Sequence, residues 1–131
     1  MSDTTRRLLR ARDAMDRRYA EPLAVEALAR SIYLSRAHFI RSFRAAFGET
    51  PHRYLQRRRI ERAMALLRHT ERPITDICLD VGFASLGSFS RTFHAVLGVW
   101  PSDYRARARD RPPADVPGCV AMAWNRPTSA R

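Results

Sequence analysis

Apolar side chains near the N-terminus recur at intervals of three and four residues among arginine and aspartate. Their positions in the stretch from Thr4 to Tyr19 are Leu8, Leu9, Ala11, Met15 and Tyr19. This spacing places the apolar residues on one face of an α-helix and the charged residues on the other. The pattern predicts an amphipathic helix from Thr4 to Tyr19 that Pro22 ends, because proline removes a backbone donor and clashes with the preceding turn.

Two shorter apolar patterns follow and are separated by a turn. Their members are Val25, Leu28, Ala29 and Ile32 in the first, and Phe39, Phe43, Ala46 and Phe47 in the second. Ser35 is a favoured N-cap, and Gly48 is a favoured residue just beyond a helix C-terminus. The sequence therefore predicts a short helix, a tight turn at Tyr33 and Leu34, and a second helix over residues 35–47.

A long helix is predicted next, over residues 51–69, because Thr50 and Pro51 suit its N-cap and first turn. Its inward positions are Tyr54, Leu55, Ile60, Ala63, Met64 and Leu67. After Pro73 the chain repeats the order of short helix, turn and helix, the last of these over residues 85–97, and a final helix runs from Trp100 to about Ala108. The fold class predicted is all-α, with about seven helices.

The second half of the pattern repeats the first in residue identity as well. Residues 35–54 and 85–104 align without a gap, and eight of the twenty positions are identical. The identical pairs are Ser35/Ser85, Phe39/Phe89, Arg41/Arg91, Phe43/Phe93, Ala45/Ala95, Gly48/Gly98, Pro51/Pro101 and Tyr54/Tyr104. One residue is inserted at the second turn, where Gly82 has the freedom to adopt a positive φ. One module thus occurs twice, in residues 4–50 and 73–109, and helix 51–69 joins the copies within a domain spanning residues 4–109.

Beyond the second module the composition changes. Residues 110–131 include Pro112, Pro113, Pro117, Gly118 and Pro127, and they show no helical or strand period. This composition predicts an irregular C-terminal tail. The apolar segment from Cys119 to Trp124 leaves open whether part of the tail docks on the domain.

The charge of the chain indicates what kind of partner it binds. The chain carries 24 basic residues, all arginine, against 13 acidic residues, for a net charge of +11, and such a chain attracts polyanions. No Asp or Glu occurs from Ala27 to Gly48 or from Val81 to Ser102. Carboxylates would repel phosphates, so each window indicates a nucleic-acid surface. A short helix, a tight turn and a basic second helix are typical of the helix-turn-helix, whose second helix enters the major groove.

The sequence gives little support for a metal site, a catalytic site or a membrane segment. Cys78 lies on an apolar helix face and Cys119 in the tail, and the sequence has neither close-spaced metal ligands nor a nucleophile paired with a base. No apolar run approaches the roughly 20 residues of a membrane-spanning helix. We therefore expect no enzyme, no cofactor, no metal site and no membrane segment, and a location in the reducing cytoplasm.

The motifs of the second module carry a family resemblance. Residues 77–93 read Ile-Cys-Leu-Asp-Val-Gly-Phe-Ala-Ser-Leu-Gly-Ser-Phe-Ser-Arg-Thr-Phe, and residues 98–105 read Gly-Val-Trp-Pro-Ser-Asp-Tyr-Arg. They resemble the signature region of the AraC/XylS transcription regulators, and the segment from Tyr54 to Leu67 resembles that family's central helix. The resemblance implies two helix-turn-helix subdomains whose recognition helices, 35–47 and 85–97, enter adjacent major-groove segments about 34 Å apart.

The same resemblance identifies candidate DNA contacts. The base-facing positions are Arg36, Ala37, His38, Ile40 and Arg41 in the first recognition helix, and Leu86, Gly87, Ser88, Ser90 and Arg91 in the second. Arg41 and Arg91 are equivalent in the repeat and suit bidentate contacts with guanine. The predicted phosphate contacts are Ser35, Arg44, Arg53, Arg57, Arg58, Ser85, His94 and Arg105.

The resemblance is to the stand-alone members of the family, so we expect no small-molecule effector domain. It implies double-stranded DNA and RNA polymerase as partners, activation of transcription, a monomer on DNA and association with the nucleoid. Two alternatives stay open. One is a less specific architectural nucleic-acid-binding protein. The other is a DNA-repair enzyme with an appended domain of this type and a cysteine that accepts a methyl group, and the missing catalytic domain argues strongly against it.

Overall fold

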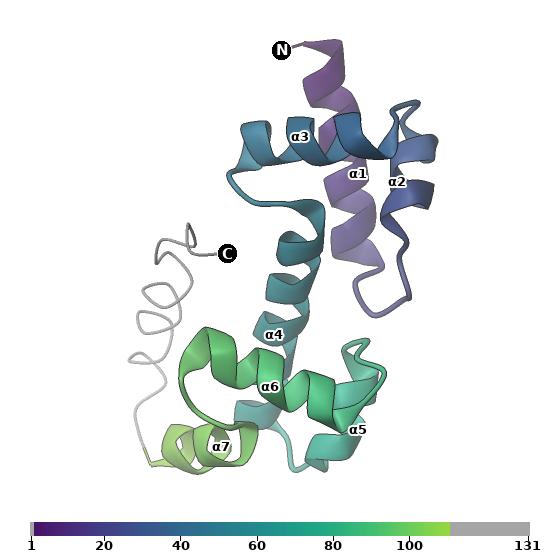
Figure 1. The fold of residues 1–131 in the computed structure, drawn as a ribbon. Helices are drawn as coiled ribbons and strands as arrows, with labels where there is room; N and C mark the ends of the chain where they lie inside the picture. The colour runs from purple at the N-terminus through teal and green to yellow at the C-terminus, as the bar shows by residue number, and fades with distance from the viewer. Residues whose placement is uncertain (1, 111–131) are drawn as a thin grey trace. The chain divides into compact units, whose positions relative to one another are not determined.

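The computed structural model describes residues 2–110, and these residues form seven α-helices and no strand (Figure 1). The helices are α1 (Asp3–Arg17), α2 (Val25–Ser31), α3 (Arg36–Phe47), α4 (Pro51–His69), α5 (Ile74–Asp80), α6 (Leu86–Leu97) and α7 (Pro101–Arg109). The all-α prediction with two helix-turn-helix subdomains and a long central helix is confirmed. Apart from Asp110, the predicted irregular tail lies outside the described residues. No helix in residues 2–110 is long and apolar enough to cross a lipid bilayer.

The predicted helix ends are present in both modules. The hydroxyl oxygens of Ser35 and Ser85 accept the backbone N–H groups of His38 and Ser88, each at 3.1 Å. Gly48 and Gly98 follow α3 and α6 in the left-handed conformation, with φ of 80° and 76°. These caps satisfy backbone groups that a helix leaves without partners at its ends.

Four details differ from the sequence predictions. α1 begins at Asp3, because the Ser2 side chain caps it by accepting from the backbone N–H of Thr5 at 3.0 Å. It ends at Arg17 rather than Tyr19, because Glu21 N–H donates to the Arg18 carbonyl at 3.0 Å and closes a turn before Pro22. α7 continues one residue further, to Arg109. Ala46, predicted on the inward stripe of α3, is exposed instead.

The chain divides into two compact units, Met1–Arg62 and Ala63–Arg131, and the division falls within α4. In the first unit α3 packs on α1 and α2 (Figure 1). Its core residues are Leu8, Ala11, Met15, Leu28, Ala29, Ile32, Phe39, Phe43, Tyr54 and Leu55. Phe43 lies at the centre of an aromatic group, with ring centroids 5.7 Å from both Phe39 and Tyr54 and 4.7 Å from Phe47.

The second unit repeats this aromatic packing. Phe93 has ring centroids 5.7 Å from Phe89 and 5.5 Å from Tyr104, and Phe83 packs on Phe89 at 5.3 Å. The other buried apolar residues are Ala63, Met64, Leu67, Ile77, Cys78 and Val81. Burial raises the pKa of the Cys78 thiol, as expected of a packing residue. The sequence repeat is therefore a repeat of the hydrophobic core.

The two helix-turn-helix turns share one geometry but use different residues. Tyr33 has a φ of 62° and Gly82 a φ of 100°, so both lie in the left-handed half of backbone space. The next residue of each turn donates its backbone N–H across the turn at 3.0 Å, from Leu34 to Ala29 and from Phe83 to Cys78. The positive φ predicted for Gly82 is confirmed. The first turn reaches a similar conformation with a bulky residue whose surface is 83% exposed.

Candidate nucleic-acid interface

The outer face of α3 carries most of the base-contact residues predicted in the first module. Phe39 and Phe43 turn one side of the helix into the core, and the opposite side faces solvent. Arg36, Ala37, His38 and Arg41 are exposed, and Ile40 is half-buried. The exposed residues thus lie together on the solvent side of one helix.

The outer face of α6 is built in the same way but carries different chemistry. Leu86, Gly87 and Arg91 are exposed, and Ser88 and Ser90 are half-buried. Arg91 is the only arginine of α6, whereas α3 contains Arg36, Arg41 and Arg44. The second face therefore presents one cation among small and apolar groups.

The charged groups on these faces differ in their partners. Within residues 2–110, Arg41, Arg44 and Arg91 form no ion pair, and the acid-free windows explain why no carboxylate is close in sequence. Arg36 is different, because its Nε lies 2.9 Å from a carboxylate oxygen of Glu26 on α2. That pair is exposed, so it contributes little to stability and is easily exchanged for another anion.

The N-termini of both recognition helices offer further donors. The Ser35 and Ser85 oxygens accept backbone N–H groups, and both serines are exposed. Each hydroxyl hydrogen therefore remains available to an external acceptor. Backbone N–H groups at a helix N-terminus also favour an anion.

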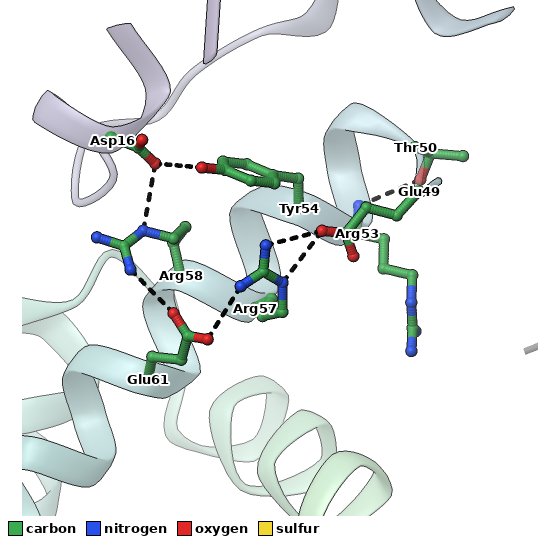
Figure 2. A network of polar contacts seen from close by, with 8 residues as sticks. All are labelled: Asp16, Glu49, Thr50, Arg53, Tyr54, Arg57, Arg58 and Glu61. Carbon is green, nitrogen blue, oxygen red and sulfur yellow. Dashed lines mark hydrogen bonds and ion pairs between the residues drawn. The ribbon is translucent and has the colours of Figure 1, made fainter. Parts of the chain in front are cut away.

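Two predicted phosphate contacts, Arg57 and Arg58, belong to a polar network inside the first unit (Figure 2). Arg57 donates to Glu49 through Nε at 3.1 Å and Nη2 at 2.9 Å, and to Glu61 through Nη1 at 3.0 Å. Arg58 pairs with Asp16 at 3.2 Å and with Glu61 at 2.9 Å. The network connects α1, the turn after α3 and the first half of α4.

Tyr54 completes the network by donating its hydroxyl to Asp16 at 2.6 Å. Burial of the ring and this hydrogen bond raise the pKa of Tyr54 to about 12. For Arg57, burial acts to lower the pKa, but the bonds to Glu49 and Glu61 outweigh it and the pKa is raised. Tyr54 therefore stays protonated and Arg57 stays charged across the physiological range, so both remain hydrogen-bond donors there.

Arg105 and Arg59 bind backbone carbonyls. Arg105, also a predicted phosphate contact, donates to the carbonyls of Leu67 and Thr70 at 3.1 and 3.3 Å, at the C-terminal end of α4. Arg59 donates to the carbonyls of Tyr19 and Glu21, each at 2.7 Å, and its burial lowers its pKa. Both guanidinium groups hold a chain segment against a helix.

The last two predicted phosphate contacts lie near helix ends. Arg53 is half-buried in the first turn of α4, where its backbone N–H donates to the Thr50 hydroxyl oxygen at 3.2 Å. His94 lies in the last turn of α6 and stacks on Trp100, with ring centroids 4.1 Å apart and an angle of 24° between the planes. The phosphate role of all eight predicted residues stays a prediction.

Comparison with known proteins agrees with this geometry. A family model described as a helix-turn-helix domain matches residues 28–107. The regulatory protein SoxS of Salmonella typhimurium is 38% identical over 93 residues, which cover 71% of this chain and 87% of that protein. SoxS of Escherichia coli K12 matches to the same extent.

Comparison with solved structures also finds transcriptional regulators. The DNA-binding domain of AdpA, a global transcriptional factor in complex with a target DNA, aligns with a TM-score of 0.77 and 31% identity. The alignment covers 81% of this chain and 96% of that one. An AraC-type regulator from Chromobacterium violaceum aligns with a TM-score of 0.74 and 29% identity, covering 83% and 97%.

The chain belongs to the AraC/XylS family. It is a DNA-binding transcription regulator, as the members of this family are, and the family is not one of enzymes. The resemblance inferred from the second module is therefore confirmed. Membership in the AraC/XylS family also accounts for the doubled helix-turn-helix, which in this chain occupies both compact units.

Some residues that contact the predicted DNA-binding side chains were not identified from the sequence. Glu61 follows Arg57 by four residues and Arg58 by three, a spacing that favours ion pairs on a helix and gave a usable signal. Asp16 and Glu49 gave none, because their partners are distant in sequence or on another element. The stacking of Trp100 on His94 likewise depends on the turn between α6 and α7.

Proposed function

We propose that the protein is a sequence-specific activator of transcription that inserts α3 and α6 into adjacent major-groove segments of double-stranded DNA. The observation that carries the proposal is the equivalence of Arg41 and Arg91. Each is exposed on the outer face of a recognition helix, and neither forms an ion pair within residues 2–110. An exposed cation that has no carboxylate partner is available to bind DNA.

In our proposal, Arg41 and Arg91 make most of the direct hydrogen bonds to bases. A guanidinium that donates to O6 and N7 of guanine contributes about 1 to 3 kcal/mol of discrimination. Arg36, His38, Ser88 and Ser90 supply further polar groups in our proposal. The apolar side chains of Ala37, Ile40 and Leu86 contact thymine methyl groups, and DNA shape adds to the choice of site.

Phosphate contacts hold the two helices in place. We assign them to Ser35 and Ser85 at the helix N-termini, to Arg44 and His94 at the other end of the recognition helices, and to Arg53. Arg57, Arg58 and Arg105 have intramolecular partners that a phosphate would have to displace. We therefore give these three a structural role, in which they fix the helices that carry the contacts.

Two modules in one chain can occupy two half-sites, which elsewhere requires a dimer. We propose on this basis that the protein binds DNA as a monomer. Contact with RNA polymerase and a cytoplasmic, nucleoid-associated location complete the proposal, and both follow from membership in the family rather than from a feature of the described residues.

The test is selection of bound fragments from random DNA, followed by footprinting and by binding of Arg41→Ala and Arg91→Ala. We expect a footprint of two half-sites about one DNA turn apart, and each variant should lose preference at a different half-site. Arg10→Ala is a matched control, because it removes an exposed arginine of α1, outside both recognition faces. It should leave the preference unchanged.

Two results would contradict the proposal. A footprint of one half-site would show that only one module reads DNA. If both variants weaken all sequences equally and change only the dependence on salt, the arginines contact phosphate alone. The protein would then be the architectural binder that the composition also allowed.

A further inference from the structure

Gly87 occupies an unusual place, in the first turn of α6 and four residues before Arg91. Glycine in a helix is less favourable than alanine by about 0.8 to 1 kcal/mol. The equivalent residue in α3 is Ala37, which precedes Arg41 by the same four residues. No positive φ requires glycine at this position, because Gly87 is helical.

The surroundings of Gly87 show what the missing side chain leaves open. A Cβ atom added to Gly87 would lie 3.0 Å from Nη1 of Arg91 and 3.6 Å from both Cζ and Nη2. The guanidinium therefore lies over Gly87, so close that a methyl group there would make an unusually tight contact with it. Residues four apart are neighbours on a helix, and long helical side chains point toward the N-terminus, so this contact is a natural one.

We propose that Gly87 is a specificity-determining residue that sets the position of the Arg91 guanidinium along α6. This inference rests on the proposed function, in which Arg91 reads a base. It adds that the absence of a side chain at residue 87 lets the guanidinium lie at the N-terminal end of the helix. Base contacts of recognition helices come from this end.

The same geometry separates the two equivalent arginines. If Arg41 lay along α3 as Arg91 lies along α6, its guanidinium would meet the Cβ of Ala37 at 3.0 Å, closer than such contacts allow without a shift. Arg41 therefore takes a different course or moves outward by a few tenths of an ångström. The repeat places the two arginines at equivalent positions but presents them to DNA differently.

No carboxylate in the described residues holds Arg91 in this position. Within residues 2–110 its guanidinium has no ion pair, and the acid-free window provides no carboxylate nearby in sequence. The neighbouring side chains at Leu86, Ser88 and Ser90 carry no charge. A single methyl group at residue 87 would make the guanidinium give way by a few tenths of an ångström, while the charge of the helix stays the same.

The experiment compares Gly87→Ala with Arg91→Ala in the full chain, on DNA duplexes that carry each of the four bases at the position where Arg91→Ala loses preference. We expect Gly87→Ala to lower the preference for the favoured base at least threefold, as part of the roughly 5- to 150-fold that loss of one bidentate contact costs. The dependence of binding on salt should not change, because no charge is lost. The melting temperature should rise, because alanine favours a helix over glycine.

Ala45→Gly serves as the matched control in the first recognition helix, at an exposed position of α3 that we assign to no DNA contact. It should lower the melting temperature and leave the preference at the second half-site unchanged. The inference is overturned if Arg91→Ala abolishes the preference and Gly87→Ala keeps it at the wild-type level. If Arg91→Ala itself leaves the preference intact, Arg91 reads no base, and the proposed function fails at this residue together with the inference.

Discussion

The two units pack the same aromatic residues at equivalent positions and share the serine caps of α3 and α6, yet they differ in the ion pairs around that core. Phe39, Phe43 and Tyr54 are matched by Phe89, Phe93 and Tyr104, with ring separations between 5.5 and 5.7 Å in both units. The polar residues attached to this frame are not matched. The repeat therefore preserves the aromatic core that folds each module, whereas the polar residues on the surface that faces DNA differ between the modules.

The difference is clearest at the turn that follows each recognition helix. In the first unit Glu49 occupies this turn and binds Arg57 of α4, whereas the second unit has Val99 and the exposed Arg107 at the equivalent positions. The second turn is instead flanked by the stacked rings of His94 and Trp100. One recognition helix is thus anchored by ion pairs and the other by packing, so their responses to mutation should differ.

The largest effect is expected from removing the central phenylalanine of either core. Phe43→Ala and Phe93→Ala should each lower the free energy of unfolding by about 3 to 5 kcal/mol, because both side chains are fully buried and the cavity is large. Hydrogen exchange should report which amides lose protection. We expect the loss in α1 to α3 for Phe43→Ala and in α5 to α7 for Phe93→Ala.

That pair of variants also tests whether the units are independent. If Phe43→Ala exposes the amides of α5 to α7 as strongly as those of α1 to α3, the two units unfold as one, and the division within α4 has no thermodynamic meaning. If only one variant is strongly destabilising, the cores are not equivalent despite their matched rings.

A smaller effect is expected when Glu49, in the turn after α3, is replaced by valine, the residue at the equivalent position of the second unit. Glu49→Val leaves the half-buried guanidinium of Arg57 with Glu61 as its remaining carboxylate, and should lower the free energy of unfolding by about 1 to 3 kcal/mol. Denaturant unfolding measures it. Arg107→Ala is the control from the second unit, and should change stability by less than about 0.5 kcal/mol because Arg107 is exposed.

Equal stability of Glu49→Val and the wild type would contradict the comparison. The network would then be a surface feature of little energetic weight, like most exposed ion pairs. Partial exposure of Glu49 and Arg57, at 14% and 23%, is the reason that we expect more than that and less than for a fully buried pair.

Most of the fold was predictable from sequence because its signals are local. The serine caps, the glycines after α3 and α6, and the apolar stripes that include Phe39 and Phe89 each act within a few residues. The end of α1 was missed, because the turn between Arg18 and Glu21 competes with helix extension before Pro22 is reached.

The candidate site was less predictable, since arginine serves two purposes in this chain. Sequence placed Arg57, Arg58 and Arg105 among the phosphate contacts because they are basic and lie on helices. Glu61 lies on the same helix as Arg57 and Arg58. Only the tertiary fold brings their other partners, Glu49 and Asp16, and the Leu67 carbonyl that Arg105 binds, close to them. Arginines with and without intramolecular partners have the same helical spacing, so the spacing of basic residues alone does not separate them.

The smallest effect is expected at the helix-turn-helix turns, where the units differ by Tyr33 and Gly82. A residue with a side chain in the left-handed conformation costs roughly 1 to 2 kcal/mol, and glycine avoids most of this cost but loses more chain entropy on folding. Tyr33→Gly should therefore raise the free energy of unfolding by about 0.5 to 1 kcal/mol, because the exposed ring gives up few contacts. Thermal unfolding at matched concentration measures the change.

Gly82→Ala is the reciprocal variant, and it should lower the free energy of unfolding by about 1 kcal/mol, because a φ of 100° strains any residue with a Cβ. Opposite signs for the two variants would show that the turns are equivalent and that only the residue differs. If Tyr33→Gly is destabilising instead, the Tyr33 side chain makes a favourable contribution that its exposure hides. The first turn would then differ from the second by more than the identity of one residue.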